Sequence, residues 1–496
     1  MTLDRRLAWS VFGLLLVSYV YFYHGGGWNE NSRFDLVRAI VEDHSLAIDR
    51  FATNTGDKAF FAGHYYSDKA PGASLAAVPV YALFRLFRPL FHDEHAFLVV
   101  ASWIVTIFAS GLPGAVTGVL VYRATRVFGA KATGALIAAL GYGLGTTAFP
   151  LSTMFFSHQL AALTLFASFF LAATGDKSLG RSAAVAALAA TSVLVEFPTA
   201  PAAAAIVLFD SGFRLSRRTW IALAALAIPA LGLGLYLTSA FGSPLHVGYQ
   251  FLSDRGSREE MRHRGLIAFG LSYPNPAVMA ELLLGRFRGL LPYSPILFLS
   301  IPGFLRALAG RSEEGGAHPV PAYRNAFRLA LGVVIYFVLF VSSYAWWQGG
   351  ASFGSRHLAP MLPFLSLPVA FVADARPRLA VVLGVVSVLF MTVVTSVQPK
   401  PSERFRNPLW QYDVPAFVRG DLALSNACPV LGSSELRGHP PFLRGRKRDA
   451  FNVGILLGGN GWKSLLPLLA LWLTAGWALH KTLRDEDATR SVPALD

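Results

Sequence analysis

Long apolar runs separated by short charged stretches make up most of this chain. The runs at 97–122, 219–240 and 379–397 have about the length, roughly 20 residues, that a helix needs to cross a bilayer. The first run covers 8–23, and the last covers 462–480. This pattern predicts an all-α polytopic membrane protein with about twelve transmembrane helices and additional outer helices at the membrane interface.

Two apolar stretches do not fit a single span. The stretch 182–210 is too long for one helix and is broken near Glu196 by two prolines, which predicts a hairpin with Glu196 at its outer tip. The stretch 73–91 is interrupted by Pro79, Arg85 and Arg88, so it either crosses the membrane or lies in the interface. The interfacial alternative is favoured because a full crossing would place Arg123 and Arg126 outside the cell.

A charged loop, 24–72, follows the first apolar run directly. Unpaired charges in hydrocarbon cost several kcal/mol each, so this loop must lie on the water side of the membrane. Its residues 33–46 carry apolar side chains at helical spacing with charges on the other face. That spacing predicts a short helix lying along the membrane surface.

Composition supports a membrane protein and limits its partners. The 496 residues are 54% hydrophobic and 15% charged, against about 25% charged in soluble domains. Most of the net charge of +14 is expected in cytoplasmic loops. Arg5 and Arg6 precede the first run, which is expected to remain uncleaved because no small-residue cleavage site follows it. We therefore predict a protein of the cell (inner) membrane with both termini cytoplasmic and the 24–72 loop outside.

Other features exclude several classes of function. No run combines basic and aromatic residues as nucleic-acid surfaces do, so no nucleic-acid partner is expected. The single cysteine, Cys428, excludes an internal disulfide and a thiolate metal cluster. We divide the chain into a transmembrane catalytic module at 1–397, an outer polar segment at 398–460, and a last transmembrane helix with a cytoplasmic tail at 461–496.

Charged and titratable residues gather at the outer ends of the predicted helices. Six separate segments carry them, which suggests an outward-facing cavity. Each residue also has a structural explanation: a packed histidine, a cap at a helix break, or an arginine that extends to lipid headgroups. Arg356 differs because it lies outside, in a glycine-rich turn, and its guanidinium can grip a phosphate through two bonds. The outer-end residues are Glu30, Asp68, Lys69, His158, Glu196, Arg286, Arg288, Arg356 and His357.

Two motifs in the first outer loop carry a family resemblance. Residues 30–34 read ENSRF, and residues 66–72 read YSDKAPG. Together they resemble the first outer loop of the GT-C membrane glycosyltransferases, in the branch of protein mannosyltransferases and lipid A aminoarabinose transferases. That branch reads Asp-Glu-x-Arg-Tyr and then Lys-Pro-Pro-Leu or His-Pro-Pro-Leu. This chain departs from it with Asn31 as the second residue of the acidic pair and with Lys-Ala-Pro-Gly as the second motif. The later stretch 346–357 (WWQGGASFGSRH) resembles a turn in bacterial members.

The resemblance implies a GT-C-like fold and the transfer of a sugar from a polyprenyl-phosphate donor to an acceptor hydroxyl at the outer membrane face. The acceptor stays open between a lipid, a glycan and a protein. Glu30 would be the general base, and Lys69 and Arg356 would stabilise the departing phosphate. No metal ligands are assigned, no cofactor is implied with certainty, and a requirement for a divalent cation stays open. The remaining expected substrate-binding residues are Arg33, Asp68, His158, Glu196 and His357.

Two other classes of function remain as alternatives. A transporter or flippase of lipid-linked glycans would place charged or broken segments near the membrane midplane and often contains internal repeats. This chain has no detectable repeat, and its charged loop lies outside the spans. A non-catalytic membrane assembly protein would leave Glu30 and Lys69 without an explanation. The sequence therefore favours the transferase.

Overall fold

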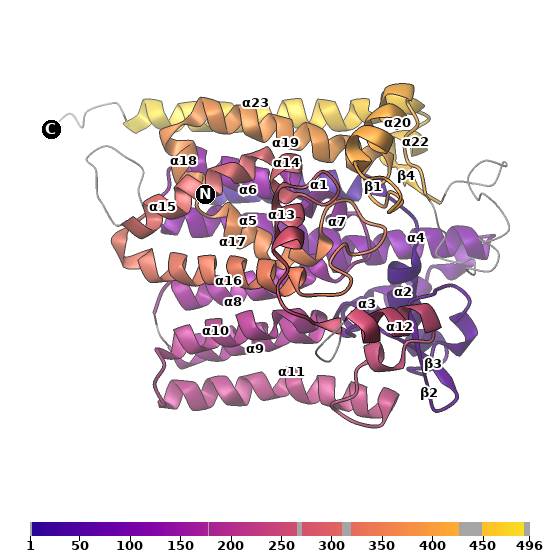
Figure 1. Ribbon diagram of the computed structural model, residues 1–496. Coiled ribbons are helices and arrows are strands. Elements are labelled where there is room, and N and C mark those ends of the chain that lie inside the picture. Colours follow the sequence, from indigo (N-terminus) through magenta and orange to yellow (C-terminus); the bar gives the residue numbers. More distant parts are fainter. Residues whose placement is uncertain (1, 177, 265–269, 310–318, 426–448, 491–496) are drawn as a thin grey trace.

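A computed structural model describes residues 2–176, 178–264, 270–309, 319–425 and 449–490. Its helices run side by side in one bundle, and the strands and irregular segments gather at one end, on the right of Figure 1. The all-α polytopic class that the hydrophobic pattern predicted is confirmed, and the chain is a multi-pass membrane protein.

The described residues contain five helical stretches that are long and apolar enough to cross a membrane, or six if one bent pair counts as a span. The first stretch joins α4 and α5 through a π-helical turn. The helices concerned are α4 (Glu94–Thr106), α5 (Leu112–Val127), α11 (Arg217–Phe241), α16 (Arg324–Ser342), α19 (Pro377–Val397), α23 (Leu466–Arg490), and the bent pair of Arg356–Ser366 with α18 (Val369–Ala375).

Shorter helices lie where the sequence predicted most of the remaining crossings. They are α1 (Leu3–Val20), α6 (Ala132–Gly145), α8 (His158–Ala173), α9 (Leu179–Val195), α10 (Ala200–Ser211) and α15 (Ser300–Ala309). The other helices are α2 (Trp28–Glu42), α3 (Gly72–Arg85), α7 (Ala148–Ser152), α12 (Arg255–Arg264), α13 (Pro276–Leu284), α14 (Leu290–Tyr293), α17 (Leu362–Ser366), α20 (Val414–Arg419) and α22 (Val453–Leu456). Strand β1 (Phe22–Tyr23) pairs antiparallel with β4 (Phe451–Asn452), and β2 (Lys58–Phe61) pairs antiparallel with β3 (His64–Ser67).

The predicted hairpin at 182–210 is confirmed. Helices α9 and α10 lie side by side, and the chain between them turns at Glu196 and a short 3₁₀ helix, Phe197–Thr199. Pro198 has no backbone N–H to continue α9, so the helix must end before it. The turn therefore brings Glu196 to the end of the bundle where α2 lies.

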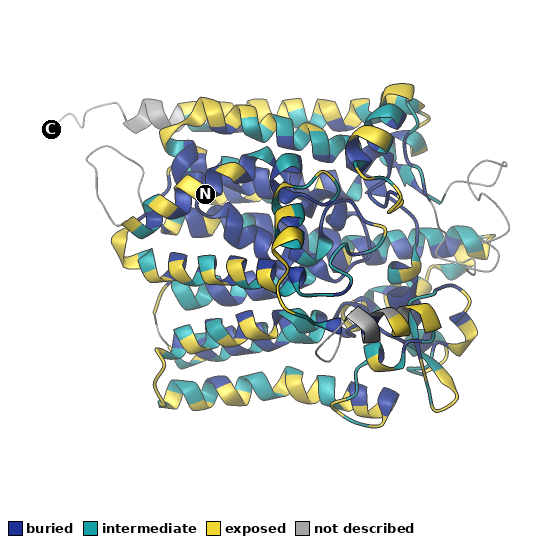
Figure 2. Cartoon of the chain, in the orientation of Figure 1, coloured by how far each residue is buried: buried dark blue, intermediate teal, exposed yellow. Residues whose placement is uncertain are grey.

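The edges of the bundle differ from its centre. Figure 2 shows buried residues in the middle and exposed residues along α11 and α23. Only 17% of the apolar window of each of these two helices is buried. Large apolar side chains such as Ile228 and Trp477 therefore point outward, as expected of helices that face lipid.

The helix predicted at 33–46 needs correcting. Helix α2 begins at Trp28 and ends at Glu42, and its charged side chains are not on an open face. Arg33, Asp35 and Arg38 are each less than 5% exposed. Arg38 pairs with Glu42, and Asn54 donates to Asp35, so partners elsewhere in the loop allow these charges to be buried.

Two other predicted segments lie near this end of the bundle. Helix α3 covers most of 73–91 and packs against α2 and α4. The outer polar segment predicted at 398–460 contains α20 and α22. Its residues 426–448, and residues 491–496 of the predicted tail, lie outside the described residues.

Candidate active site

A cavity of about 280 Å³ lies at the end of the bundle that carries α2, β2 and β3. Its wall is built by the loop 24–72, the start of α8, the end of α9, and the turn after α16. Tyr249, Tyr344 and Trp346 add aromatic surface to it. Seven of the eight residues that the sequence proposed for the site line this cavity: Arg33, Asp68, Lys69, His158, Glu196, Arg356 and His357.

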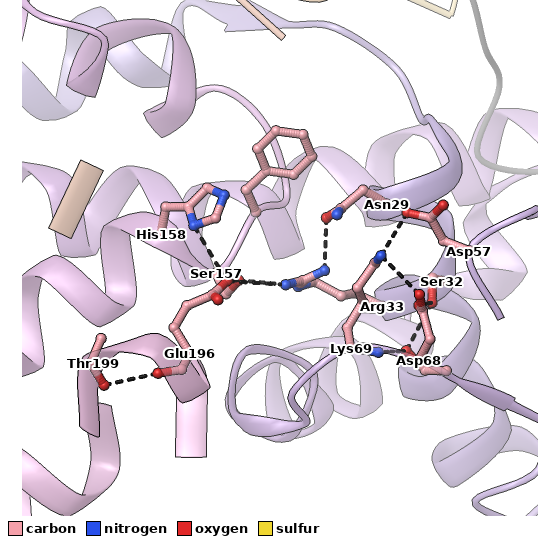
Figure 3. A network of polar contacts seen from close by, with 12 residues as sticks. Asn29, Ser32, Arg33, Asp57, Asp68, Lys69, Ser157, His158, Glu196 and Thr199 are labelled. Atoms are coloured by element: carbon pink, nitrogen blue, oxygen red, sulfur yellow. Dashed lines mark hydrogen bonds and ion pairs between the residues drawn. The ribbon is translucent and has the colours of Figure 1, made fainter. Parts of the chain in front are cut away.

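Arg33 stands at the centre of the polar network in the cavity. Asn29 and Arg33 are one helical turn apart on α2, so both side chains project from the same face. Arg33 Nη1 donates to Asn29 Oδ1 over 2.7 Å, and Nη2 donates to Ser157 Oγ over 2.5 Å. Figure 3 shows the Arg33 side chain between two groups of polar side chains.

The first group is the imidazole cluster, which we define as Ser157, His158 and Glu196. His158 Nδ1 lies 3.3 Å from Glu196 Oε1, and the Ser157 hydroxyl donates to the same oxygen. Arg33 Nη2 lies 3.5 Å from it as well. The cluster joins the start of α8 to the end of α9, so the helix break holds a carboxylate against a histidine ring (Figure 3).

The second group is the lysine cluster, which we define as Asp57, Asp68 and Lys69. Lys69 Nζ lies 2.8 Å from Asp57 Oδ2 and 3.0 Å from Asp68 Oδ2. The Asp57 side chain is 27% exposed, and that of Asp68 is 3% exposed. One ammonium thus bridges two carboxylates (Figure 3), of which Asp57 is the more exposed.

The pKa values of the two carboxylates in the lysine cluster shift in opposite directions from the ordinary value. Burial raises the pKa of Asp68, and this effect outweighs the attraction of Lys69. Burial acts on Asp57 too, but the charge and hydrogen bond of Lys69 prevail and lower the pKa of Asp57. Arg356 and Arg33 lower it further, so both arginines act on the same side chain across the cavity. The cluster therefore favours the charged form of Asp57 more than that of Asp68.

The turn after α16 presents Arg356. Gly349, Gly350 and Gly354 have φ between 64° and 74°, a left-handed backbone that side chains disfavour. The Arg356 guanidinium lies 5.0 Å from the centre of the Phe156 ring. It forms no hydrogen bond or ion pair with any residue that the structure describes, and its Nε is buried without a partner. The cavity therefore contains a cation that contacts no carboxylate among the described residues.

Arg288 stabilises this turn through hydrogen bonds to its main chain. It is fully buried, and its guanidinium donates to the carbonyl oxygens of Gly350, over 2.7 Å, and of Ser352. The alternative that Arg288 only extends to lipid headgroups is therefore wrong. Arg288 stabilises the backbone path that presents Arg356 to the cavity.

Glu30, the sequence candidate for the general base, does not line the cavity. Its side chain is rotated about 100° around α2 from that of Asn29. Glu30 is 4% exposed, and its Oε1 accepts from Lys400 Nζ over 2.6 Å. Lys400 also donates to the carbonyl oxygen of Gly26. A carboxylate engaged in this way fits a contact between two segments, and the base assignment of Glu30 stays a prediction without support from the cavity geometry.

Asp57 is not among the site residues proposed from the sequence, although a signal for it exists. Two aromatic-rich segments, 58–61 (KAFF) and 64–67 (HYYS), flank Ala62 and Gly63, a pattern typical of a hairpin. In the observed register Lys58 pairs with Ser67, which places the next residues, Asp57 and Asp68, at the same end of the hairpin. The hairpin therefore delivers both carboxylates to Lys69.

No group of three or more metal-ligating side chains is close enough to hold a metal ion among the residues that the structure describes. The carboxylates of the lysine cluster are held by an ammonium, and Glu196 is held by a histidine. The arrangement can bind an anion at Arg356, keep Asp57 charged, and present an imidazole beside a carboxylate.

Comparisons with known proteins give a limited result. No family model and no curated protein matches this chain. ArnT from Cupriavidus metallidurans bound to undecaprenyl phosphate matches with a TM-score of 0.47 and 14% identity, covering 96% of this chain and 77% of that chain. The apo state of the same protein matches with a TM-score of 0.43 and 16% identity, covering 96% and 76%. At this level of similarity, function has to be judged from the residues of the cavity.

Proposed function

We propose that this protein is a glycosyltransferase that moves a sugar from a polyprenyl-phosphate donor to an acceptor hydroxyl at the outer membrane surface. The observation that carries the proposal is Arg356, a cation in the cavity that forms no ion pair with any described carboxylate. A phosphate group would supply the missing counter-ion. The resemblance of 30–34 and 66–72 to the first outer loop of GT-C glycosyltransferases supports the same reaction class.

The position of the cavity suits a substrate with one apolar and one charged part. Exposed apolar helices flank the bundle, and the cavity lies at its end, among the loops. A polyprenyl chain could remain in lipid while its phosphate reaches Arg356. The aromatic side chains of Tyr249, Tyr344 and Trp346 would border the sugar, as aromatic side chains commonly do in ligand pockets.

Lys69 would be the second cation at the phosphate. Asp57 and Asp68 already hold its ammonium, so an incoming phosphate must compete with Asp57, the more exposed of the two. Negative charge on the phosphate grows as its bond to the sugar breaks, and Arg356 and Lys69 would stabilise that charge. Asn29 and Arg33 would border the same space from α2.

We further propose that the cavity faces outward from the cell (inner) membrane and that both termini are cytoplasmic. The support is the charge distribution of the loops and the start of α1 toward the end of the bundle opposite α2. Cysteines introduced singly at Trp28 and Arg214, in a protein whose own Cys428 is replaced by serine, test this orientation. An impermeant thiol reagent applied to whole cells should label only position 28, and labelling of position 214 alone would reverse the assignment.

The anion site is tested with Arg356→Gln. Binding of undecaprenyl phosphate to the purified full-length protein should weaken about 10- to 100-fold, the weight of a charge-assisted hydrogen bond. The control is Arg419→Gln, which removes an exposed arginine that does not line the cavity. Unchanged binding in Arg356→Gln would contradict the phosphate site. Tight binding without transfer by the wild-type protein would favour the flippase or the assembly protein.

A further inference from the structure

The imidazole cluster has the arrangement of a general base with its orienting carboxylate. His158 Nδ1 faces Glu196 Oε1 at 3.3 Å, so the neutral ring places its proton on Nδ1 and leaves the Nε2 lone pair available. Nε2 has no hydrogen-bond partner among the described residues. It is not one of the fully buried polar atoms that lack a partner, so it is accessible. His158 lines the cavity, so this nitrogen is available to a group bound there.

The other carboxylates and histidines at the cavity are less suited to accept a proton. Asp57 and Asp68 are engaged by Lys69, and Asp254 and Glu403 are exposed at the rim. His357 packs edge-on against His158, with ring centres 5.9 Å apart, and has no carboxylate partner within the described chain. Glu30 lies outside the cavity lining. His158 is the cavity residue that combines access with an orienting partner.

We propose that His158, oriented by Glu196, is the general base of the transfer, an inference that rests on the proposed function. Nε2 takes the proton of the acceptor hydroxyl while the acceptor oxygen forms its bond to the anomeric carbon. The bond from that carbon to the phosphate oxygen breaks, and its electron pair stays on the phosphate beside Arg356. The resulting imidazolium is stabilised by Glu196 and later releases its proton to water.

Glu196 and Arg33 are positioning residues in this arrangement. Three donors converge on Glu196 Oε1: His158 Nδ1, the Ser157 hydroxyl and Arg33 Nη2. They fix the carboxylate at the end of α9, and the carboxylate in turn fixes the ring and its tautomer. Arg33 also reaches Asn29 on its own helix, so the base side of the cavity is tied to the first outer loop.

The test uses the full-length protein in detergent and measures release of undecaprenyl phosphate from undecaprenyl-phosphate glucose, mannose and galactose. Water, ethanol and trifluoroethanol are the acceptors. His158→Asn keeps an amide N–H near the position of Nδ1 and so keeps the contact with Glu196, but it has no base. We expect kcat to fall 10²- to 10⁴-fold while binding of undecaprenyl phosphate stays within threefold. The loss should be smaller with trifluoroethanol, whose hydroxyl is more acidic.

The pH profile distinguishes a base from a structural residue. The wild-type kcat/KM should fall on the acid side as His158 is protonated, and this limb should disappear in His158→Asn. Glu196→Gln should move the limb without changing undecaprenyl phosphate binding. The charged and titratable groups that face the ring are Glu196, Arg33, Arg356 and His357, and none of them is altered in His158→Asn.

A matched control is available at the surface. His64 Nδ1 lies 2.7 Å from Asp49 Oδ2, a histidine–carboxylate pair outside the cavity lining. His64→Asn should leave kcat unchanged. Full kcat in a folded His158→Asn protein would overturn the assignment of the base and leave the transferase intact. A wild-type protein that releases no undecaprenyl phosphate from any of the three donors would instead overturn the proposed function, and with it this inference.

Discussion

Glu30 and Glu196 are both buried glutamates at the same end of the bundle, but their surroundings differ. Glu30 is paired with the ammonium of Lys400, away from the cavity lining. Glu196 lines the cavity and shares one oxygen with a histidine, a serine and an arginine. A carboxylate neutralised by a lysine is a fixed contact, whereas one that holds a neutral imidazole can support a change of charge on that ring. The partner therefore indicates the role better than the residue type does.

The largest effect is expected from Lys400→Met, which removes the partner of Glu30. Glu30 would remain buried and charged without compensation, which should lower the free energy of unfolding by about 3–5 kcal/mol. Guanidinium unfolding of the purified protein measures it. In the double variant Lys400→Met/Glu30→Gln most of the loss should be recovered. If the double variant is as unstable as the single one, the Glu30–Lys400 contact is not the reason.

A smaller effect, on the order of 1 kcal/mol, is expected from substitutions in the lysine cluster. Its carboxylates pair with a lysine, as Glu30 does, and line the cavity, as Glu196 does. The folded protein raises the pKa of Asp68, so its contribution to stability is present at low pH and is lost as pH rises through the folded pKa. Asp68→Asn mimics the protonated form. Its stability relative to wild type should therefore increase as pH rises above the unfolded value, about 3.9, measured by thermal unfolding.

Asp57→Asn should behave in the opposite way. The pKa of Asp57 is lowered, so its contribution is present above the unfolded value, about 3.9, and is lost only as pH falls below that value. Asp57→Asn should thus be less stable than wild type throughout pH 5 to 8. Equal pH dependence of the two variants would show that Asp57 and Asp68 do not differ as their burial indicates.

The smallest effect is expected from Glu30→Gln. This substitution tests most directly whether Glu30 is the general base or whether that role belongs to His158 with Glu196. The amide still accepts a hydrogen bond from Lys400, and the cavity lining is untouched. We expect kcat of the folded variant to change less than about threefold. A loss of 10²- to 10⁴-fold without loss of donor binding would restore Glu30 as the general base. Lys69 cannot serve as a control in this comparison, because it lines the cavity.

The sequence predicted the fold class and seven of the nineteen residues that line the cavity for identifiable reasons. Apolar runs and loop charges report on the membrane directly, and Pro198 makes the break beside Glu196 visible. Residues at the ends of helices on one side of a membrane share one surface. His158, Glu196 and Arg356 could therefore be grouped before their contacts were known.

The partners of these residues could not be predicted in the same way. Lys400 is 370 positions from Glu30, and no local pattern links them. The periodicity of 33–46 placed charges on an open face, but Asn54 donates to Asp35 from the loop beyond the helix, and Glu196 reaches Arg33 from a separate helix. Contacts that depend on the packing of distant segments decided which charged side chain is structural and which faces the cavity.

Arg288 has a consequence for how the turn after α16 can evolve. Both of its hydrogen bonds end on carbonyl oxygens, of Gly350 and Ser352, and every residue type supplies that atom. The arginine thus depends on the path of the main chain and not on the side chains of the turn. The turn can exchange many of its side chains over time and still present Arg356, provided that Arg288 and the glycines in left-handed conformations persist. Distant relatives should then share the shape of this turn while agreeing at few of its positions.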